Sequence, residues 1–282
     1  NNTSVVGSNI GNEITKIDLD RLEKEALISV ANIKNKKVIH TIPIKYKLDH
    51  NEIQGSPIGM FGKRIEGKFL FVLAPTLYVE KIENILSQIN LPIEEVVVGP
   101  FAECIPLLNK KQRVAGTALV NIGHSTTSIL VYENNNPTIA LGLQTSLEEA
   151  EEIKLGVSGL SYSKRKFDEI VEARVEFICE KINAELEKIG RKELLPGGIV
   201  LTGGGSKLAK IEYMIKNNLK LPVKFANDEI REFSDGQLKD SSFAKVYGLT
   251  FLAPSVSINY SVKKIFDDFL KNIGNIFKKL LP

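Results

Sequence analysis

The sequence predicts an α/β protein with more than one cored unit. Its 282 residues are 43% hydrophobic and 25% charged, the balance typical of a soluble globular protein. Short stretches with strand periodicity alternate with longer amphipathic helical stretches along most of the chain. Two of the buried strands, 117–121 and 198–202, run into turns rich in glycine, serine and threonine. These observations favour sheets whose strand ends carry a binding site.

The first third of the chain predicts a compact α+β unit behind a polar opening, residues 1–15. The predicted elements are a helix over 19–33 with Asp18 as its N-cap, strands over 37–48 and 65–73, a helix over 75–89 and a buried strand over 95–98. In the second helix we expect five apolar residues to face inward: Leu77, Ile82, Ile85, Leu86 and Ile89.

The rest of the chain predicts a second unit. Its elements are a short helix over 101–108, strands over 117–121 and 128–132, a third strand after the turn 133–137, an acidic helix over 147–155, a long helix over 166–189, a buried strand over 198–202, a further helix over 207–218 and a short strand over 223–225. Cys104 and Cys179 lie in apolar helical contexts and are expected to be small core residues. The three histidines lack ligand spacing, which argues against zinc chemistry.

The first candidate site is the turn between the strands 117–121 and 128–132. Gly123, Ser125 and Thr126 follow Asn121 there, so backbone N–H groups and hydroxyls gather at one strand end. Such groups suit a polyphosphate. An ordinary hairpin turn has the same composition and stays an alternative.

The second candidate site is the run Gly203, Gly204 and Gly205, which follows the buried strand 198–202 and opens a helix. Glycines allow the backbone to approach a nucleotide closely, and a helix N-terminus faces negative charge. The spacing is neither that of a dinucleotide-binding fingerprint nor that of a P-loop. A tight strand-to-helix turn is the alternative.

The third candidate is the acidic helix that carries Glu151 and Lys154. Three residues apart, these side chains share a helical face and could hold a ribose or adenine edge from opposite charges. A solvated, salt-bridged helix is the alternative interpretation.

In this order, the three stretches resemble the nucleotide cleft of the superfamily that contains actin and the heat-shock chaperone ATPases. The segments 40–49 and 55–66 closely resemble the inserted 1C subdomain of the FtsA family of bacterial cell-division proteins. The resemblance extends from residue 17 to the C-terminus. It implies α/β, actin-like (ribonuclease H-like) lobes with an inserted α+β 1C subdomain of the SHS2 type.

The resemblance also implies a division of the chain into six parts. These are residues 1–36 as the remainder of the first lobe (1A), 37–98 as the 1C subdomain, 99–116 as the return to 1A and crossover, 117–254 as the second lobe (2A/2B), 255–260 as a linker, and 261–282 as an amphipathic helix that targets a membrane.

The last segment supports this interpretation independently. From Ser261 to Pro282 five lysines stand against two aspartates, a net charge of +3 that equals the formal charge of the whole chain. Its apolar residues fall on one helical face with lysines on the flanks, as in helices that lie in a bilayer interface. The residues expected to contact an anionic membrane are Ile265, Phe266, Phe269, Ile273, Phe277, Lys263, Lys264, Lys278 and Lys279. A docked core helix is the alternative.

Three departures from the family argue against an active enzyme. The strand hairpin with which the family begins, and its first phosphate loop, do not precede Asn1, so the chain is expected to be N-terminally incomplete. The second phosphate loop starts with Asn121 in place of the family's aspartate, and an amide cannot act as a base. The family's segment between the third strand and the acidic helix is not found near Ala140, where either this lineage shortened it or a loop was left out of the sequence.

The resemblance implies an adaptor in cell division that is at most a weak ATPase. ATP, with Mg²⁺, would be a structural ligand that promotes polymerisation, and no catalytic residue or protein-held metal is expected. The partners implied are the C-terminal peptide of FtsZ, further copies of the chain, an anionic membrane surface and other division proteins, with no nucleic acid. Lys210, Tyr213 and Lys216 are the candidates to receive the peptide, and the implied location is the cytoplasmic face of the inner membrane at the septum.

Three rival functions stay open. A true ATPase resembling sugar kinases or chaperones would need a catalytic carboxylate, against which Asn121 argues. A pilus-assembly adaptor resembling PilM shares the fold but lacks the terminal helix, so residues 261–281 decide between the two adaptors. An inactive FtsA-like fragment is the third.

Overall fold

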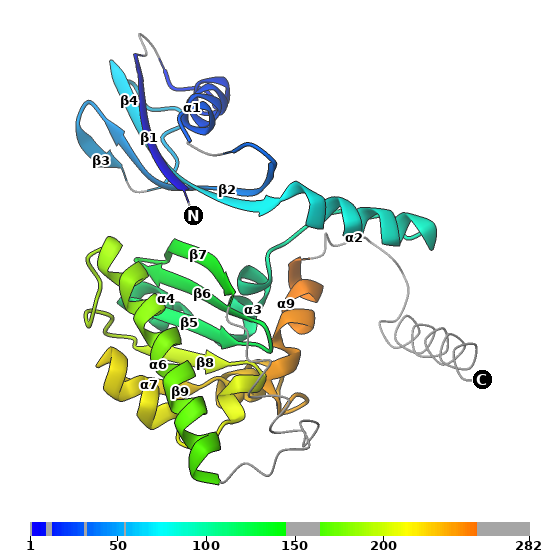
Figure 1. Ribbon diagram of the computed structural model, residues 1–282. Helices are drawn as coiled ribbons and strands as arrows, with labels where there is room; N and C mark the ends of the chain where they lie inside the picture. The colour runs from blue at the N-terminus through cyan, green and yellow to red at the C-terminus, as the bar shows by residue number, and fades with distance from the viewer. Residues whose placement is uncertain (1, 10–12, 31–32, 54, 145–163, 253–282) are drawn as a thin grey trace. The chain divides into compact units, whose positions relative to one another are not determined.

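The structure is a computed structural model, and it describes residues 2–9, 13–30, 33–53, 55–144 and 164–252 (Figure 1). By its contacts the chain divides into two units, Asn1–Leu249 and Thr250–Pro282. Only the first three residues of the second unit belong to the described part. The first unit contains a four-stranded and a five-stranded sheet.

The four-stranded sheet belongs to an N-terminal α+β domain. Its elements are β1 (Asn2–Asn9), α1 (Lys16–Ile28), β2 (Lys36–Leu48), β3 (Asn51–Ile53) and β4 (Arg64–Pro75), with antiparallel strand order β1-β4-β2-β3. Leu22 and Ala26 of α1 are fully buried and pack with Phe69 and Phe71, which project from one face of β4. The alternation of β4 therefore fixes which face of the sheet α1 covers.

The predicted strands over 37–48 and 65–73 are confirmed as β2 and β4. The polar residues at the start of the chain, in contrast, form a strand that was not predicted. Residues 2–9 form a strand, β1, which pairs antiparallel with β4 from Asn2 opposite Phe71 to Asn9 opposite Arg64. As an edge strand, β1 needs no continuous apolar pattern, which is why its polar sequence did not predict a strand. The predicted domain boundary at residue 36 separates β1 and α1 from β2 and β4, whereas β1 pairs with β4 and α1 packs in the same core.

Helix α1 begins three residues earlier than predicted, at Lys16. Its N-cap is Thr15, whose side chain accepts from the backbone N–H of Asp18, while the Asp18 carboxylate accepts from the backbone N–H of Thr15 at 2.9 Å. Asp18 is thus the third residue of a capping box and not the cap itself. Its hydrogen bonds to Thr15 lower the pKa of its carboxyl below the ordinary value.

The helix predicted over 75–89 forms as α2 (Thr76–Gln88), but its predicted inward face is wrong. Only Val79 is buried, whereas Leu77, Ile82, Ile85 and Ile89 are each more than half exposed and Leu86 is intermediate. Periodicity identifies an apolar face without identifying what covers it. The strand predicted over 95–98 is also wrong, because residues 91–98 have neither helical nor strand structure. A short β-branched run forms a strand only where a neighbouring strand pairs with it.

The five-stranded sheet forms the core of the second domain. Its strands are β5 (Thr117–Ile122), β6 (Thr126–Glu133), β7 (Asn136–Gln144), β8 (Ile199–Thr202) and β9 (Val223–Phe225), in the order β7-β6-β5-β8-β9. Strands β5, β6 and β7 form an antiparallel meander, while β8 and β9 continue the sheet in parallel with β5. The mixture is that of an α/β sheet with an antiparallel edge.

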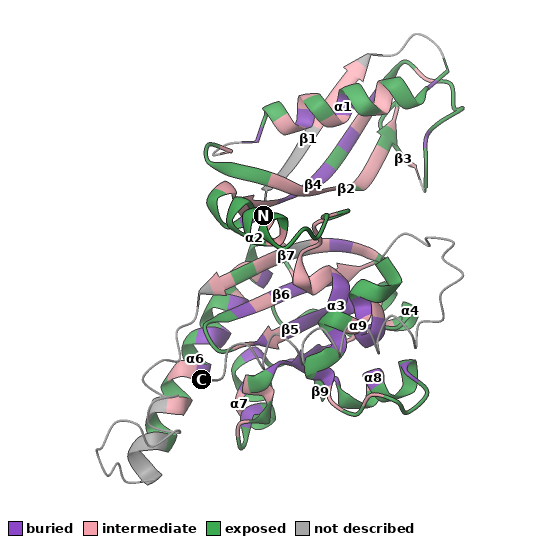
Figure 2. Ribbon diagram, turned by 90° about the vertical axis from the view of Figure 1, so that its right-hand side faces the viewer, coloured by how far each residue is buried: buried purple, intermediate pink, exposed green. Residues whose placement is uncertain are grey.

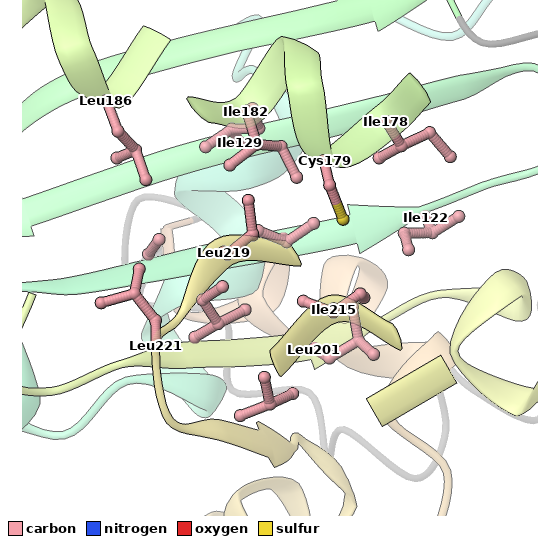
Figure 3. Packing of buried hydrophobic residues seen from close by; sticks show 14 of the residues in the cluster. Ile122, Ile129, Ile178, Cys179, Ile182, Leu186, Leu201, Ile215, Leu219 and Leu221 are labelled. Carbon is pink, nitrogen blue, oxygen red and sulfur yellow. The ribbon is translucent and has the colours of Figure 1, made fainter. Parts of the chain in front are cut away.

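Helices cover both faces of this sheet. The helices are α3 (Gly99–Leu107), α4 (Lys110–Ala115), α6 (Lys164–Lys188), α7 (Ile211–Leu219), α8 (Asn227–Phe233) and α9 (Ala244–Leu252), with short 3₁₀ helices η1 (Gly204–Lys207) and η2 (Ser241–Phe243). On one face α6 and α7 pack on alternate residues of β5, β6 and β8, as Figure 3 shows for Ile122, Ile129, Ile182 and Ile215. On the other face lie α3, α8 and α9.

Most predictions for the second domain are confirmed. The short helix over 101–108, the strands around the turn at Gly123, the long helix over 166–189 and the short strand over 223–225 all form. The helix predicted over 207–218 is divided between η1 and α7, and Cys104 and Cys179 are buried, 4% and 1% exposed. Figure 2 shows how buried residues concentrate along β5 and on the sheet side of the helices. The acidic helix predicted over 147–155 lies outside the described residues.

Candidate functional site

The two glycine-containing turns begin side by side. Strands β5 and β8 are parallel neighbours, with Asn121 opposite Thr202 in the register, so both strands end at the same edge of the sheet. The turn after β5 contains Gly123, and the turn after β8 contains Gly203. The parallel pairing therefore places two backbone turns, which are some eighty residues apart in the sequence, next to each other.

The first turn exposes hydroxyl groups. The backbone N–H of Gly123 donates to the carbonyl oxygen of Thr126 at 2.9 Å, which closes the turn between β5 and β6. His124, Ser125 and Thr126 are exposed, so their side chains are accessible at its surface. Exposed hydroxyls beside a strand end are able to bind phosphate oxygens.

The second turn needs glycine because it passes directly over the first strand. Gly203 has a φ of 90°, and a Cβ there would lie 2.5 Å from the carbonyl oxygen of Ile122 and would overlap the Asn121 Oδ1 atom. A Cβ at Gly205 would overlap the Ile122 side chain, whereas nothing lies within 4 Å of one at Gly204. The first and third glycines are thus required by close approach of the two turns, and Gly204 alone opens toward solvent.

A buried carboxylate that was not predicted from the sequence lies beneath the turns. Glu103 of α3 is 3% exposed, and its Oε1 atom accepts from the Asn121 Nδ2 at 2.5 Å and pairs with the Lys245 Nζ of α9 at 3.4 Å. Burial raises the pKa of Glu103 above its ordinary value, against the opposing effects of Lys245 and Asn121. A single charge within the apolar stretch 101–108 was the sequence signal that could have identified it.

The second turn is also fixed from its far side. The buried Thr202 hydroxyl donates to the Ser241 Oγ at 3.0 Å, and Lys207 forms an ion pair with Asp240 at 2.7 Å. Hydrogen bonds from Lys207 and Ser242 hold the pKa of the Asp240 carboxyl well below its ordinary value. The segment around η2 therefore anchors η1 through both a neutral and a charged contact.

The three residues predicted to receive a peptide lie on or next to α7. Ile211, Ile215 and Leu219 form its buried face, which leaves Tyr213 67% exposed. Lys210 is the N-cap, in the left-handed conformation. Lys216 contributes to a hollow of about 530 Å³ whose other lining residues are Asn217, Lys220, Leu221, Pro222 and Val223.

Two groups of predicted site residues are not placed. Glu151 and Lys154 lie outside the described residues, and so do the predicted membrane residues between Lys263 and Lys279. The structure therefore brings together Asn121, the first turn and the three glycines, while the roles of all these residues stay predictions. Within the described part of the chain, no helix has the length and apolarity to span a membrane.

Comparison with known proteins identifies the N-terminal domain. The family model described as the SHS2 domain inserted in FTSA matches residues 1–73, the region that contains β1, α1, β2, β3 and nearly all of β4. This match includes the segments 40–49 and 55–66, on which the predicted FtsA resemblance was based. The matched region includes β1 and α1, which lie before the predicted 1C boundary at residue 37.

Curated relatives extend the similarity along most of the chain. The cell division protein FtsA of Pseudomonas aeruginosa is 26% identical over 249 residues, covering 75% of this chain and 60% of the relative. FtsA of Bacillus subtilis is 26% identical over 264 residues, covering 80% and 59%. The chain spans about three fifths of the length of these curated relatives.

A solved structure supports the fold. The PilM-PilN type IV pilus biogenesis complex matches with a TM-score of 0.61 at 18% identity, covering 88% of this chain and 76% of the other. The predicted actin-like fold is therefore confirmed, together with its inserted domain. The chain thus contains a match to the SHS2 domain inserted in FTSA, is similar to FtsA proteins along most of its length, and shares the fold of the PilM-PilN structure.

Proposed function

We propose that the chain acts in bacterial cell division as an adaptor that tethers FtsZ filaments to the cytoplasmic membrane and recruits later division proteins. The observation that carries the proposal is the joint similarity to FtsA of the SHS2 domain and of most of the chain. The sequence from Ser261 to Pro282 adds to it, since its lysine-flanked apolar pattern is that of a helix in a bilayer interface. The site of action would be the cytoplasmic face of the inner membrane at the septum.

Nucleotide is proposed to be a structural ligand of the paired turns. Gly123, Ser125 and Thr126 would face its phosphates, and Gly203, Gly204 and Gly205 its adenosine. Because Asn121 provides an amide at the end of β5, rapid turnover is not expected. Bound ATP, with Mg²⁺, would favour the assembly of the chain into filaments.

The membrane tether is tested by pelleting with vesicles. The full chain is mixed with FtsZ and vesicles that contain phosphatidylglycerol, and it is compared with a chain that ends at Tyr260. We expect FtsZ to pellet only with the full chain, because the lysines and the apolar face act together on anionic lipid. A Phe269→Glu/Phe277→Glu variant should lose pelleting, whereas the matched change Asn272→Ser, outside the apolar face, should keep it.

The outcomes of pelleting separate the rival functions. If the full chain pellets and FtsZ does not, the tether is supported and the proposed partner is wrong. If neither pellets, the division adaptor is contradicted. The remaining candidates are then a pilus-type adaptor, which the likeness to the PilM-PilN complex favours, and an inactive fragment. Pelleting in neutral vesicles as strong as in anionic ones would contradict the role given to the lysines.

The peptide site is tested on α7. A Tyr213→Ala/Lys216→Glu variant should bind the FtsZ C-terminal peptide at least about tenfold more weakly, because it removes an exposed aromatic anchor and reverses a charge that would face an acidic peptide. Fluorescence anisotropy of a labelled peptide measures this affinity. Lys111→Glu on α4 is the matched charge control, and an equal loss in that variant would mean that the effect is general electrostatic attraction.

A further inference from the structure

Two described lysines near the paired turns are already neutralised. Lys207, at the end of η1, is bound to Asp240 at 2.7 Å, and Lys245 is bound to Glu103 at 3.4 Å. A polyphosphate at these turns would meet N–H groups and hydroxyls, while both lysine charges are already compensated. A cation that arrives with the ligand would offset the negative charge that these two lysines do not.

Glu103 has one carboxylate oxygen without a partner. Its Oε1 atom receives both contacts, from Asn121 and Lys245, whereas its Oε2 atom is buried and has no hydrogen-bond partner among the described residues. A buried carboxylate oxygen that accepts nothing is costly. The site is thus short of one positively charged or donating group at this atom.

Asn121 complements this carboxylate and orients a second oxygen. Because the Glu103 oxygen is an acceptor, the Asn121 amide must present its Nδ2 to it, and its Oδ1 is then directed to Gly203 in the second turn. An aspartate at position 121 would place two carboxylates against each other. The amide at the end of β5 and the glutamate on α3 therefore form a matched pair in which the charge belongs to Glu103.

These residues fit a magnesium ion that accompanies a nucleotide. Mg²⁺ prefers oxygen ligands, keeps several waters and needs only one or two carboxylates from the protein in addition to phosphate oxygens. We infer that Glu103 is the carboxylate through which this site holds the divalent cation of its nucleotide, and that the cation binds at its Oε2 atom in competition with the Lys245 ammonium group on the same carboxylate. This inference rests on the proposed nucleotide site.

Binding of labelled ADP to the full chain tests the inference. The fluorescence of N-methylanthraniloyl-ADP is followed while MgCl₂ is titrated from an EDTA-containing baseline, and the half-saturating Mg²⁺ concentration is recorded. Glu103→Gln, which keeps the shape and removes the charge, should raise that concentration at least about tenfold. Lys245→Gln should lower it several-fold, because the competing ammonium group is gone.

The matched control is Glu229→Gln. Glu229 of α8 also has a buried Oε2 atom without a partner in the described part of the chain, but its contact is Gln112 of α4, at 3.5 Å. The hydroxyl of Thr117, at the start of β5 and away from the turns at its other end, donates to the backbone carbonyl oxygen of Gln112. We expect Glu229→Gln to leave the half-saturating Mg²⁺ concentration unchanged.

The half-saturating Mg²⁺ concentration is expected to rise in Glu103→Gln and to fall in Lys245→Gln. These opposite changes separate cation binding from a structural role. If both variants weaken the response to Mg²⁺ equally, or if Glu103→Gln responds like the parent chain, the inference is overturned while the nucleotide site stands. If the parent chain binds no labelled ADP at any Mg²⁺ concentration, the proposed nucleotide ligand is overturned, and the inference with it.

Discussion

Replacing Gly248 by alanine should lower the free energy of unfolding by about 3 kcal/mol, as expected for overpacking against a rigid backbone. Gly248 lies in α9, and a Cβ at this position would overlap the carbonyl oxygen of Ala102 in α3. Backbone cannot rotate away as a side chain can, so the two helices must separate. The separation would also disturb Glu103 and Lys245, which join the same two helices.

Chemical denaturation of the full chain, followed by far-ultraviolet circular dichroism, measures this loss. Gly204→Ala is the matched control, because nothing lies within 4 Å of a Cβ at Gly204. Its unfolding free energy should stay within about 0.5 kcal/mol of that of the parent chain. Equal stability of the two variants would mean that α9 does not pack on α3 as described.

Removing Lys245 should make the stability of the protein strongly dependent on pH. Loss of one partner of a buried ion pair costs about 3–5 kcal/mol, and we expect about 2 kcal/mol for Lys245→Gln because the Lys245 side chain is half exposed. This loss should be present at pH 8 and largely absent at pH 4. Denaturation curves at both pH values, measured in EDTA, check it.

The direction of this pH dependence follows from the titration of the Glu103 carboxyl group. Burial raises its pKa in the folded protein above the ordinary value of 4.5, so the folded state binds the proton more tightly than the unfolded state. The unfolding free energy therefore falls as the pH rises from about 4.5 through the raised pKa. Lys245 opposes that rise in pKa, so its removal deepens the loss. The double variant Lys245→Gln/Glu103→Gln should lack this pH dependence, and its persistence there would assign the effect to another group.

Periodicity predicted the elements well wherever a strand or helix has one buried and one exposed face. Helix α6, whose buried residues recur at helical spacing from Val175 to Leu186, was identified for this reason. It failed for β1, whose polar residues carry no apolar alternation, and it failed for residues 95–98, whose β-branched run has no strand beside it. Periodicity also identified the apolar stripe of α2, but it assigned this stripe to the core, whereas most of its residues are more than half exposed.

The candidate site, too, could be predicted from the sequence only in part. The glycines at 123 and 203–205 were visible in the sequence because few other residues fit such turns. Glu103 was not identified, because a single glutamate in an apolar helix does not reveal what it contacts. Only the crossing of α3, α9 and the end of β5 shows that it is buried against Asn121 and Lys245.

The sequence by itself determined the α/β class, the order of most elements, the resemblance to FtsA and the two turns that follow β5 and β8. These features depend on local periodicity and on residue types with few conformational alternatives. The tertiary structure alone decided that β1 completes the SHS2 sheet, that the two turns lie side by side, and that the charge beneath them belongs to Glu103. Strand pairing and desolvation arise between residues far apart in the chain, so no local pattern encodes them.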